Sequence, residues 1–207
     1  MSAMTAGIVY APTLPALVHR ILARRLATAL TPESLFREIF DDTGAPSEEA
    51  MAEDVPRYVE RDFTASTPLD VLLFSNGFHA LATHRISSTL FAGGREDDAR
   101  LLAGIATKVF GAELHPAAKI GQRVFLDHGQ GVVIGETATI GDDCAIFQGV
   151  TLGSTAKTDG KRHPTLLAGV IVGAGAKIIG AVTVGAGAVI GPNAVVTEDV
   201  EAGARLR

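Results

Sequence analysis

The sequence LLAGVIVGAGAKIIGAVTVGAGAVIGPNAVV, residues 166–196, decides the fold of this chain. An aliphatic residue recurs at every sixth position: Leu166, Val172, Ile178, Val184, Ile190 and Val196. The residue four positions after each aliphatic is small or β-branched. The residue directly after each aliphatic is often glycine. A strict six-residue repeat is typical of a parallel β-helix, in which each hexad supplies one short strand and one corner. No single coil buries its apolar side, so the coils must stack to form a core.

The same period extends back to residue 114, with two departures. The earlier aliphatic positions are Leu114, Ile120, Leu126, Ile134, Ile140, Ile146 and Leu152. Two extra residues follow Leu126, and eight extra residues lie between Leu152 and Leu166. A β-helix takes insertions at its corners, and such loops usually carry function. We therefore predict a β-helical domain over residues 113–207, with a functional inserted loop at 153–165.

Residues 1–112 are predicted to form a helical domain, which makes the whole chain an α+β protein. Thr31-Pro32 and Thr67-Pro68 each combine an N-cap residue with a proline in the first turn. Gly77 interrupts a helical pattern, which predicts that another backbone approaches closely there. The expected helices cover residues 15–29, a segment from Pro32 to about residue 44, a short segment capped by Ser47, residues 56–61, a long segment from Pro68 through Ile86, and residues 96–110.

Composition excludes several classes of function. The net charge of −5 does not suit a nucleic-acid partner. No apolar run reaches membrane-spanning length, and the N-terminus lacks the charged-then-apolar order of a signal peptide. The single Cys144 excludes an internal disulfide and a cysteine-based zinc site, and its hexad position predicts inert core packing. We expect a soluble cytoplasmic protein.

His128 is the main candidate for a catalytic residue. It follows Asp127 on the two-residue insertion and lies about one coil after Glu113. A carboxylate one coil away can reach an imidazole, fix its tautomer and raise its basicity. A histidine held in this way acts as a general base for a hydroxyl group.

Other charged residues suit the two ends of an amino acid. Asp62 and Asp127 are suited to an ammonium group, whereas Arg162 and His163 are suited to a carboxylate. Each of these residues taken alone also fits an ordinary surface or structural role. Together with His128 they predict a site for an amino acid that carries a hydroxyl.

A zinc site shared between subunits is the metal-based alternative. His115, His128 and His163 lie in or near the β-helix, as do the histidine ligands of γ-class carbonic anhydrases. That family takes two histidines from one short segment, and the spacing here does not fit. We therefore predict no metal.

Several segments of the chain resemble one known family. In the β-helix they are LHPAAKIG at 114–121, LDH at 126–128, VIGET at 133–137, QGVTLG at 148–153, RHP at 162–164 and VGAGAKI at 172–178. The helical part adds Arg61-Asp62, Thr67-Pro68, GFHAL at 77–81 and HRI at 84–86. In this order and spacing they resemble serine O-acetyltransferase over about residues 55–196.

The resemblance implies a left-handed parallel β-helix and a direct transfer reaction. His128 would deprotonate the hydroxyl of L-serine, which then attacks the thioester of acetyl-CoA without an acyl-enzyme intermediate. Glu113 would assist His128, at a position where the family usually has aspartate. The subunits would form a homotrimer, often paired into a hexamer, with active sites between neighbouring β-helices.

The resemblance also assigns the binding residues. Asp62 and Asp127 would hold the serine ammonium group, and Arg162 and His163 its carboxylate. The cleft for CoA would be lined by Gly153, Ser154, Thr155, Gly173 and Ala174.

The chain departs from the family pattern mainly on the CoA side and at its tail. Gly153-Ser154-Thr155-Ala156-Lys157 stands where the family usually reads Gly-Gly-Thr-Gly-Lys, and Gly129-Gln130 replaces Ala-Thr. The tail that enters cysteine synthase in this family is missing, so we expect no docking of that enzyme through it. Pro192 also stands at a position in a late coil where the family usually has a small residue.

Three interpretations remain open. The first is a serine acetyltransferase of cysteine biosynthesis or of a related specialised pathway. The second is an acyltransferase with another donor, such as succinyl-CoA, or another acceptor, such as homoserine. The third is an inactive trimeric scaffold, which would have no need of the full set of polar residues named above.

Overall fold

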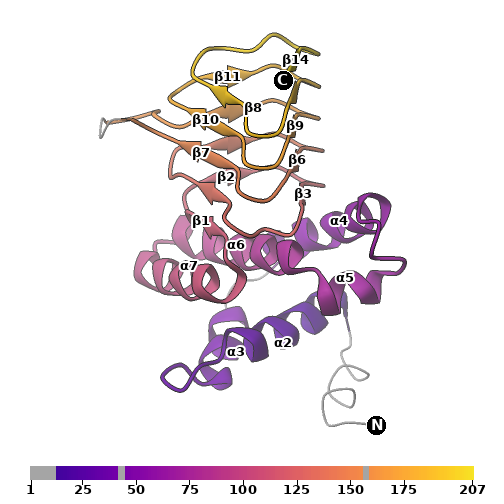
Figure 1. The fold of residues 1–207 in the computed structure, drawn as a ribbon. Coiled ribbons are helices and arrows are strands. Elements are labelled where there is room, and N and C mark those ends of the chain that lie inside the picture. Colours follow the sequence, from indigo (N-terminus) through magenta and orange to yellow (C-terminus); the bar gives the residue numbers. More distant parts are fainter. Residues whose placement is uncertain (1–12, 42–44, 156–158) are drawn as a thin grey trace.

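A helical region and a β-helix form the two parts of the molecule, and α6 of the helical region packs directly against the first coil (Figure 1). The computed structural model describes residues 13–41, 45–155 and 159–207. In these ranges the helices are α2 (Leu14–Leu26), α3 (Glu33–Asp41), α4 (Ala45–Arg61), α5 (Pro68–Phe74), α6 (Asn76–Ala92) and α7 (Glu96–Phe110). The extent predicted for the last helix is confirmed, and the first strand begins three residues after it ends.

Helix α4 corrects two of the predictions. Ser47 and Pro56 lie within one continuous helix, where we expected a short helix capped by Ser47 and a separate one from residue 56. Proline in a helix removes one backbone hydrogen bond and crowds the preceding turn. Here Asp54 and Tyr58, on either side of Pro56, hydrogen-bond to the backbone of the β-helix, so tertiary contacts hold both halves of the helix in line.

The long helix expected from Pro68 is instead two helices. The break lies at Ser75, which ends α5 and is also the N-cap of α6. Its side chain accepts a hydrogen bond from the backbone N–H of Phe78, 3.3 Å away. The close approach predicted at Gly77 is confirmed, because a Cβ there would lie 1.8 Å from the carbonyl oxygen of Leu126. Gly77 is therefore required for packing and does not end the helix.

The strands form three parallel sheets that close into a left-handed β-helix. Sheet A has the order β1-β4-β7-β10-β13, sheet B β11-β8-β5-β2, and sheet C β14-β12-β9-β6-β3. The strands of sheet A are β1 (Glu113–Leu114), β4 (Val133–Ile134), β7 (Thr151–Gly153), β10 (Lys177–Ile179) and β13 (Val195–Val196). Those of sheet B are β2 (Lys119–Ile120), β5 (Thr139–Ile140), β8 (Thr165–Leu166) and β11 (Thr183–Val184). Those of sheet C are β3 (Phe125–Leu126), β6 (Ala145–Ile146), β9 (Ile171–Val172), β12 (Val189–Ile190) and β14 (Arg205–Leu206).

The hexad aliphatics stack inside the β-helix, as predicted. In sheet A, Leu114 pairs in register with Ile134, and Ile134 in turn with Leu152. The hexad aliphatics from Leu114 to Val196 are almost fully buried, except for the half-buried Ile120, and Cys144 is buried among them. Burial raises the pKa of the Cys144 thiol to about 11, which agrees with the predicted inert core position.

Two corners of the β-helix carry most of the predicted site residues. The C–A corner joins sheet C to sheet A and comprises residues 127–132, 147–150, 173–176 and 191–194. The A–B corner joins sheet A to sheet B and comprises residues 115–118, 135–138, 154–164 and 180–182. The two corners lie at opposite ends of the short strands of sheet A. The long insertion therefore belongs to the A–B corner and the two-residue insertion to the C–A corner.

Candidate functional site

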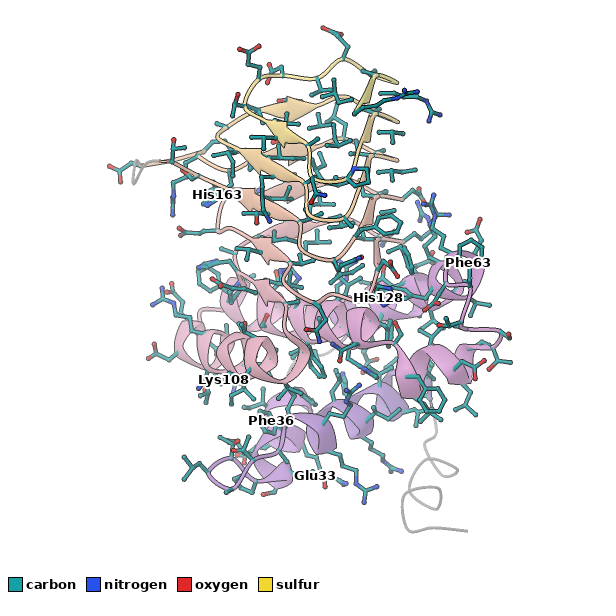
Figure 2. The ribbon with its side chains drawn as sticks, viewed as in Figure 1. Glu33, Phe36, Phe63, Lys108, His128 and His163 are labelled. Carbon is teal, nitrogen blue, oxygen red and sulfur yellow. The ribbon has the colours of Figure 1, made fainter. Side chains whose placement is uncertain are left out.

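The predicted site residues fall into two groups at opposite corners. Asp127, His128, Gly173 and Ala174 lie on the C–A corner. Arg162 and His163 lie on the A–B corner, where the loop after β7 begins with Ser154 and Thr155; Gly153 is the last residue of β7. Figure 2 shows His128 beside the helices and His163 on the other side of the β-helix. A single chain does not bring the two groups together.

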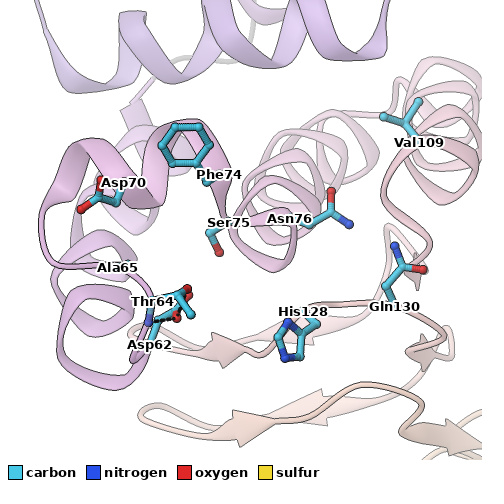
Figure 3. Close-up of a pocket in the computed structure, with 10 residues that line it drawn as sticks. All are labelled: Asp62, Thr64, Ala65, Asp70, Phe74, Ser75, Asn76, Val109, His128 and Gln130. Carbon is cyan, nitrogen blue, oxygen red and sulfur yellow. Dashed lines mark hydrogen bonds between the residues drawn. The ribbon is translucent and has the colours of Figure 1, made fainter.

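His128 lines a cavity between the C–A corner and the helical region (Figure 3). The cavity has a volume of about 370 Å³. Its polar side chains come from both parts of the molecule, with Asp62, Asn76 and Gln130 among them. Helices α5, α6 and α7, with the segment between α4 and α5, therefore supply a wall opposite the β-helical residues.

The backbone at His128 adopts a left-handed conformation, with φ of 56°. This conformation is uncommon for a residue other than glycine and lets the chain turn sharply after β3. The turn leaves 67% of the His128 side chain exposed, with its Nε2 atom 3.5 Å from Oδ2 of Asp127. The imidazole is thus accessible to a ligand and has one carboxylate beside it.

Asp62 lines the cavity, and Asp127, beside His128, lies close enough to interact with it, so this part of the site is acidic. Burial raises the pKa of Asp127, and the nearby charge of Asp62 raises it further, while His128 opposes the shift. The Asp62 carboxylate accepts hydrogen bonds from the backbone N–H and the hydroxyl of Thr64, at 2.8 and 2.6 Å. Two carboxylates this close favour a bound cation, because a cation offsets their repulsion.

At the A–B corner, Thr137 fixes the orientation and the tautomer of His163. The backbone N–H of Thr137 donates to Nδ1 of His163 at 3.2 Å, so this nitrogen is an acceptor. The neutral ring therefore carries its proton on Nε2, which is free to donate to a ligand. Burial lowers the pKa of His163, and the charge of Arg162 lowers it further, so the neutral form is favoured.

The hydroxyl of Thr137 completes this arrangement. It accepts hydrogen bonds from the backbone N–H groups of Arg162 and His163, both at 3.0 Å. Its own proton is then directed to Nδ1 of His163, 2.9 Å away. One hydroxyl thus ties the end of the inserted loop to the coil below it.

Arg162 is held by Glu136. Its Nη2 group forms an ion pair with the Glu136 carboxylate, which lowers the pKa of that carboxyl group. The guanidinium has further N–H groups that this contact does not use, and these suit a second anion. His163 packs over Gly135, where a Cβ would lie 2.1 Å from the ring. Arg162 and His163 therefore present adjacent donors on one surface.

Glu113 lies on the outer face of sheet A, between the two corners. Its side chain is exposed, and the residue pairs in register with Val133 of the next coil. The charge of Glu113 raises the pKa of His115, whereas burial lowers that pKa and is the larger effect. Glu113 does not line the cavity that contains His128. Its pairing with His128 stays a prediction.

Several polar residues of the site were given no role in the sequence analysis, and four of them matter most. They are Asn76 and Gln130 in the His128 cavity, and Glu136 and Thr137 beneath Arg162 and His163. The last two follow Gly135 at a corner, and a polar pair at the corner below the inserted loop is a signal that could have identified them.

The described residues of the two corners form no group of ligands that could hold a metal ion within one chain. The histidines of the zinc alternative do not meet within one chain, because His128 lies on a different corner from His115 and His163. Across residues 13–41, 45–155 and 159–207, no three or more His, Cys, Asp or Glu side chains are grouped so that they could hold a metal ion. The helices described above include none that is long and apolar enough to cross a membrane.

Comparison with known proteins places the chain in a known class of enzymes. Residues 163–198 match the family model of the bacterial transferase hexapeptide (six repeats), so the chain is a hexapeptide-repeat transferase. Residues 1–83 match the model of the serine acetyltransferase N-terminal region. The chain belongs to the serine acetyltransferase family, as the relatives described next also show.

A serine acetyltransferase of Synechococcus elongatus is 49% identical over 150 residues, which are 72% of this chain and 62% of the relative. The matched region thus spans less than two thirds of that protein. The crystal structure of the Brucella abortus serine acetyltransferase in complex with coenzyme A has a TM-score of 0.92 and 37% identity, covering 96% of this chain and 81% of the other. The Neisseria gonorrhoeae enzyme in complex with serine has a TM-score of 0.93 and 32% identity, covering 98% and 84%.

Proposed function

We propose that this chain is a serine O-acetyltransferase, which transfers the acetyl group of acetyl-CoA to the hydroxyl of L-serine and forms O-acetyl-L-serine. Family membership supports the proposal, and the polar groups at the two corners suit the chemistry of serine. Acetyl-CoA and serine are intracellular metabolites, so we place the activity in the cytoplasm. The product serves cysteine biosynthesis or a related pathway.

The observation that carries the proposal is the division of polar groups between the corners. The C–A corner offers Asp127, with Asp62 of the helical region near it, for the ammonium group, and His128 for the hydroxyl. The A–B corner offers Arg162 and the Nε2–H group of His163 for the carboxylate. These are the three polar groups of serine, and each meets a partner of complementary charge or proton affinity.

A homotrimer would bring the two corners together. They lie at opposite ends of sheet A, too far apart in one chain to hold a molecule as small as serine. Closed rings with head-to-tail contacts place one surface of a subunit against a different surface of the next. Around a threefold axis the C–A corner of one chain would meet the A–B corner of its neighbour. The two segments predicted to line the CoA cleft fit the same arrangement, because Gly173-Ala174 and Gly153-Ser154-Thr155 also lie at opposite ends of sheet A.

The reaction needs a base at the serine hydroxyl. His128 takes the hydroxyl proton as the oxygen attacks the acetyl carbonyl carbon, and a C–O bond forms. The C–S bond then breaks, and the departing sulfur of CoA takes a proton from the imidazolium. We place Glu113 across the interface from the neighbour's catalytic histidine, where its carboxylate would orient that ring and stabilise its charged form.

Thiol release from a panel of CoA thioesters tests the proposed activity. Acetyl-CoA, propionyl-CoA and succinyl-CoA would each be mixed with serine or homoserine, and free thiol would be measured. We expect the largest kcat/KM for acetyl-CoA with serine. A larger value for another pair would favour the alternative acyltransferase, and no release with any pair would favour the scaffold.

Mixed trimers test whether the site is shared. Chains carrying His128→Ala would be coexpressed with chains carrying Arg162→Ala, and kcat/KM for serine would be compared with that of each variant alone. A shared site predicts recovery, because a mixed trimer contains an interface with both residues intact. If each chain held its own complete site, the mixture would show only the average of the two variants.

A further inference from the structure

The first strand of sheet C has one edge that faces the helices. Strand β3 is the end strand of its sheet, so half of its backbone groups lack a neighbouring strand. The N–H groups of Phe125 and Asp127 donate to the next coil, at 2.9 and 2.8 Å. The intervening groups, on Val124 and Leu126, face the other way, and buried backbone groups without partners are costly.

Helix α4 satisfies this edge with side chains. Asp54 accepts a hydrogen bond from the N–H of Val124 at 3.2 Å. The hydroxyl of Tyr58 accepts from the N–H of Leu126 at 3.0 Å and donates to the carbonyl oxygen of the same residue at 3.3 Å. Tyr58 therefore replaces both hydrogen bonds that a neighbouring strand would make at Leu126.

Tyr58 is itself fixed in place. Its side chain is fully buried, and its ring contacts Phe78 and Phe125 edge-on, with centroid distances of 5.5 and 4.9 Å. Burial raises the pKa of the hydroxyl well above its ordinary value, so it stays protonated and keeps its role as a donor. The hydroxyl position is therefore set by packing on both sides of the ring.

The backbone held by Tyr58 leads directly into the catalytic turn. His128 follows Leu126 by two residues and has a left-handed φ of 56°, a conformation that costs energy and persists only where the surroundings impose it. Gly77 of α6 supports the same turn, since it contacts the Leu126 carbonyl, and a Cβ on Gly129 would lie 3.2 Å from the Gly77 Cα. The turn is thus held just before and just after His128 by the helical region.

We propose that Tyr58 is a positioning residue for His128, acting through the backbone of Leu126. The hydroxyl sets where the chain leaves β3, and this sets the direction of the imidazole in the cavity. This inference rests on the proposed function, in which His128 is the base. It assigns the helical region a part in the acetyl transfer itself, beyond that of covering the end of the β-helix.

The test uses Tyr58→Phe in the full chain, with Asp54→Asn as a matched control on the same edge. Removing the hydroxyl should lower kcat about tenfold, with KM for acetyl-CoA unchanged. In a His128→Ala background the same substitution should give no further loss, because its effect passes through the imidazole. Asp54→Asn breaks the buried ion pair with Arg85 and should reduce thermal stability with a smaller effect on kcat.

A second readout is independent of turnover. The titration of His128 would be followed by NMR through its ring protons, in the wild type and in both variants. Tyr58→Phe should shift this titration, and Asp54→Asn should leave it in place. An unchanged His128 titration in Tyr58→Phe, or an equal loss of kcat with and without His128, would overturn the proposal. An inactive wild type would instead refute the proposed function, and the titration would still decide the role of Tyr58.

Discussion

The two corners of the β-helix position their functional residues by different means. The His128 corner is held from outside, by Tyr58 and Gly77 of the helical region. The His163 corner is held from within the β-helix, by the hydroxyl and backbone of Thr137 one coil below. The proposed carboxylate-binding surface is therefore built by the hexapeptide coils alone, whereas the corner that carries the proposed base depends on how the helices dock.

The largest expected effect is at the base itself. The serine hydroxyl is a very weak acid, so attack on a thioester needs a base within hydrogen-bonding distance. His128→Ala should reduce kcat by roughly 10²–10⁴-fold, or about 3–5 kcal/mol in activation free energy. The assay is steady-state thiol release, with light scattering to check that the oligomer is intact. A variant with near wild-type kcat would remove His128 from the mechanism.

Substitutions at Glu113 separate its role from that of the base. Glu113→Gln should reduce kcat by less than His128→Ala does, because the carboxylate only orients and stabilises the imidazole. Glu113→Asp should retain most of the activity if the corners meet with the family's geometry. Full activity in Glu113→Gln, with an unchanged pH profile of kcat/KM, would show that Glu113 is a solvated residue of sheet A.

The two buried histidines of α6 should weaken the helical side in acid, against an opposite contribution from Asp54, whose pKa burial raises to about 6. Burial lowers the pKa of His79 to about 4 and that of His84 to about 3, and both residues lie on α6. Because the unfolded chain binds protons at these residues from about pH 6.5 downward, the free energy of unfolding should fall as the pH drops from 6.5 toward 4. The loss is on the order of 3 kcal/mol for His79.

Chemical unfolding at several pH values measures this loss. His79→Gln, which does not titrate, should show a shallower dependence on pH than the wild type over the same range. His79 lies against Arg25, which donates to its Nδ1 atom, so protonation would also place two positive charges together. Equal slopes for the two proteins would show that carboxylates alone govern acid unfolding.

Arg162 should affect acceptor binding more than turnover. A charge-assisted hydrogen bond contributes roughly 1.5–3 kcal/mol, so Arg162→Ala should raise the KM for serine at least about tenfold. The KM for acetyl-CoA should stay close to the wild-type value. A parallel rise of both constants would instead assign Arg162 to the CoA cleft or to the structure of the loop.

The sequence predicted the coils because a period of six residues corresponds directly to one strand and one corner. It also predicted the close approach at Gly77, since few residues other than glycine tolerate a backbone at that distance. The continuity of α4 through Pro56 was missed, because the hydrogen bonds of Asp54 and Tyr58 to the β-helix lie far away in sequence. Local propensity alone favoured a break there.

The candidate site was predicted as a set of residue types, while its division between corners was not. Three hexads complete one turn of the β-helix, so residues recur on the same corner after about eighteen positions, as Ala194 does after Ala176. The eight-residue insertion hides this relation for Arg162 and His163. The cavity residue Gln130 was also missed, because its place opposite Asp62 depends on how α4 docks against the turn after His128.

The smallest effect expected is at Thr137, and it tests whether the His163 corner is built by the coils alone. Thr137→Val removes the acceptor of two backbone N–H groups and one hydrogen bond to the ring of His163, but it keeps the backbone N–H that fixes the tautomer. A loss of about 0.5–1.5 kcal/mol should raise the KM for serine roughly three- to tenfold. Because His128 belongs to the other corner, kcat at saturating serine and the pH profile of kcat should stay unchanged. Thr165→Val, the same substitution on the outer face of sheet B in the coil above, is the control and should leave both constants as they are. If Thr137→Val lowered kcat as strongly as Tyr58→Phe, the two corners would be coupled through the β-helix.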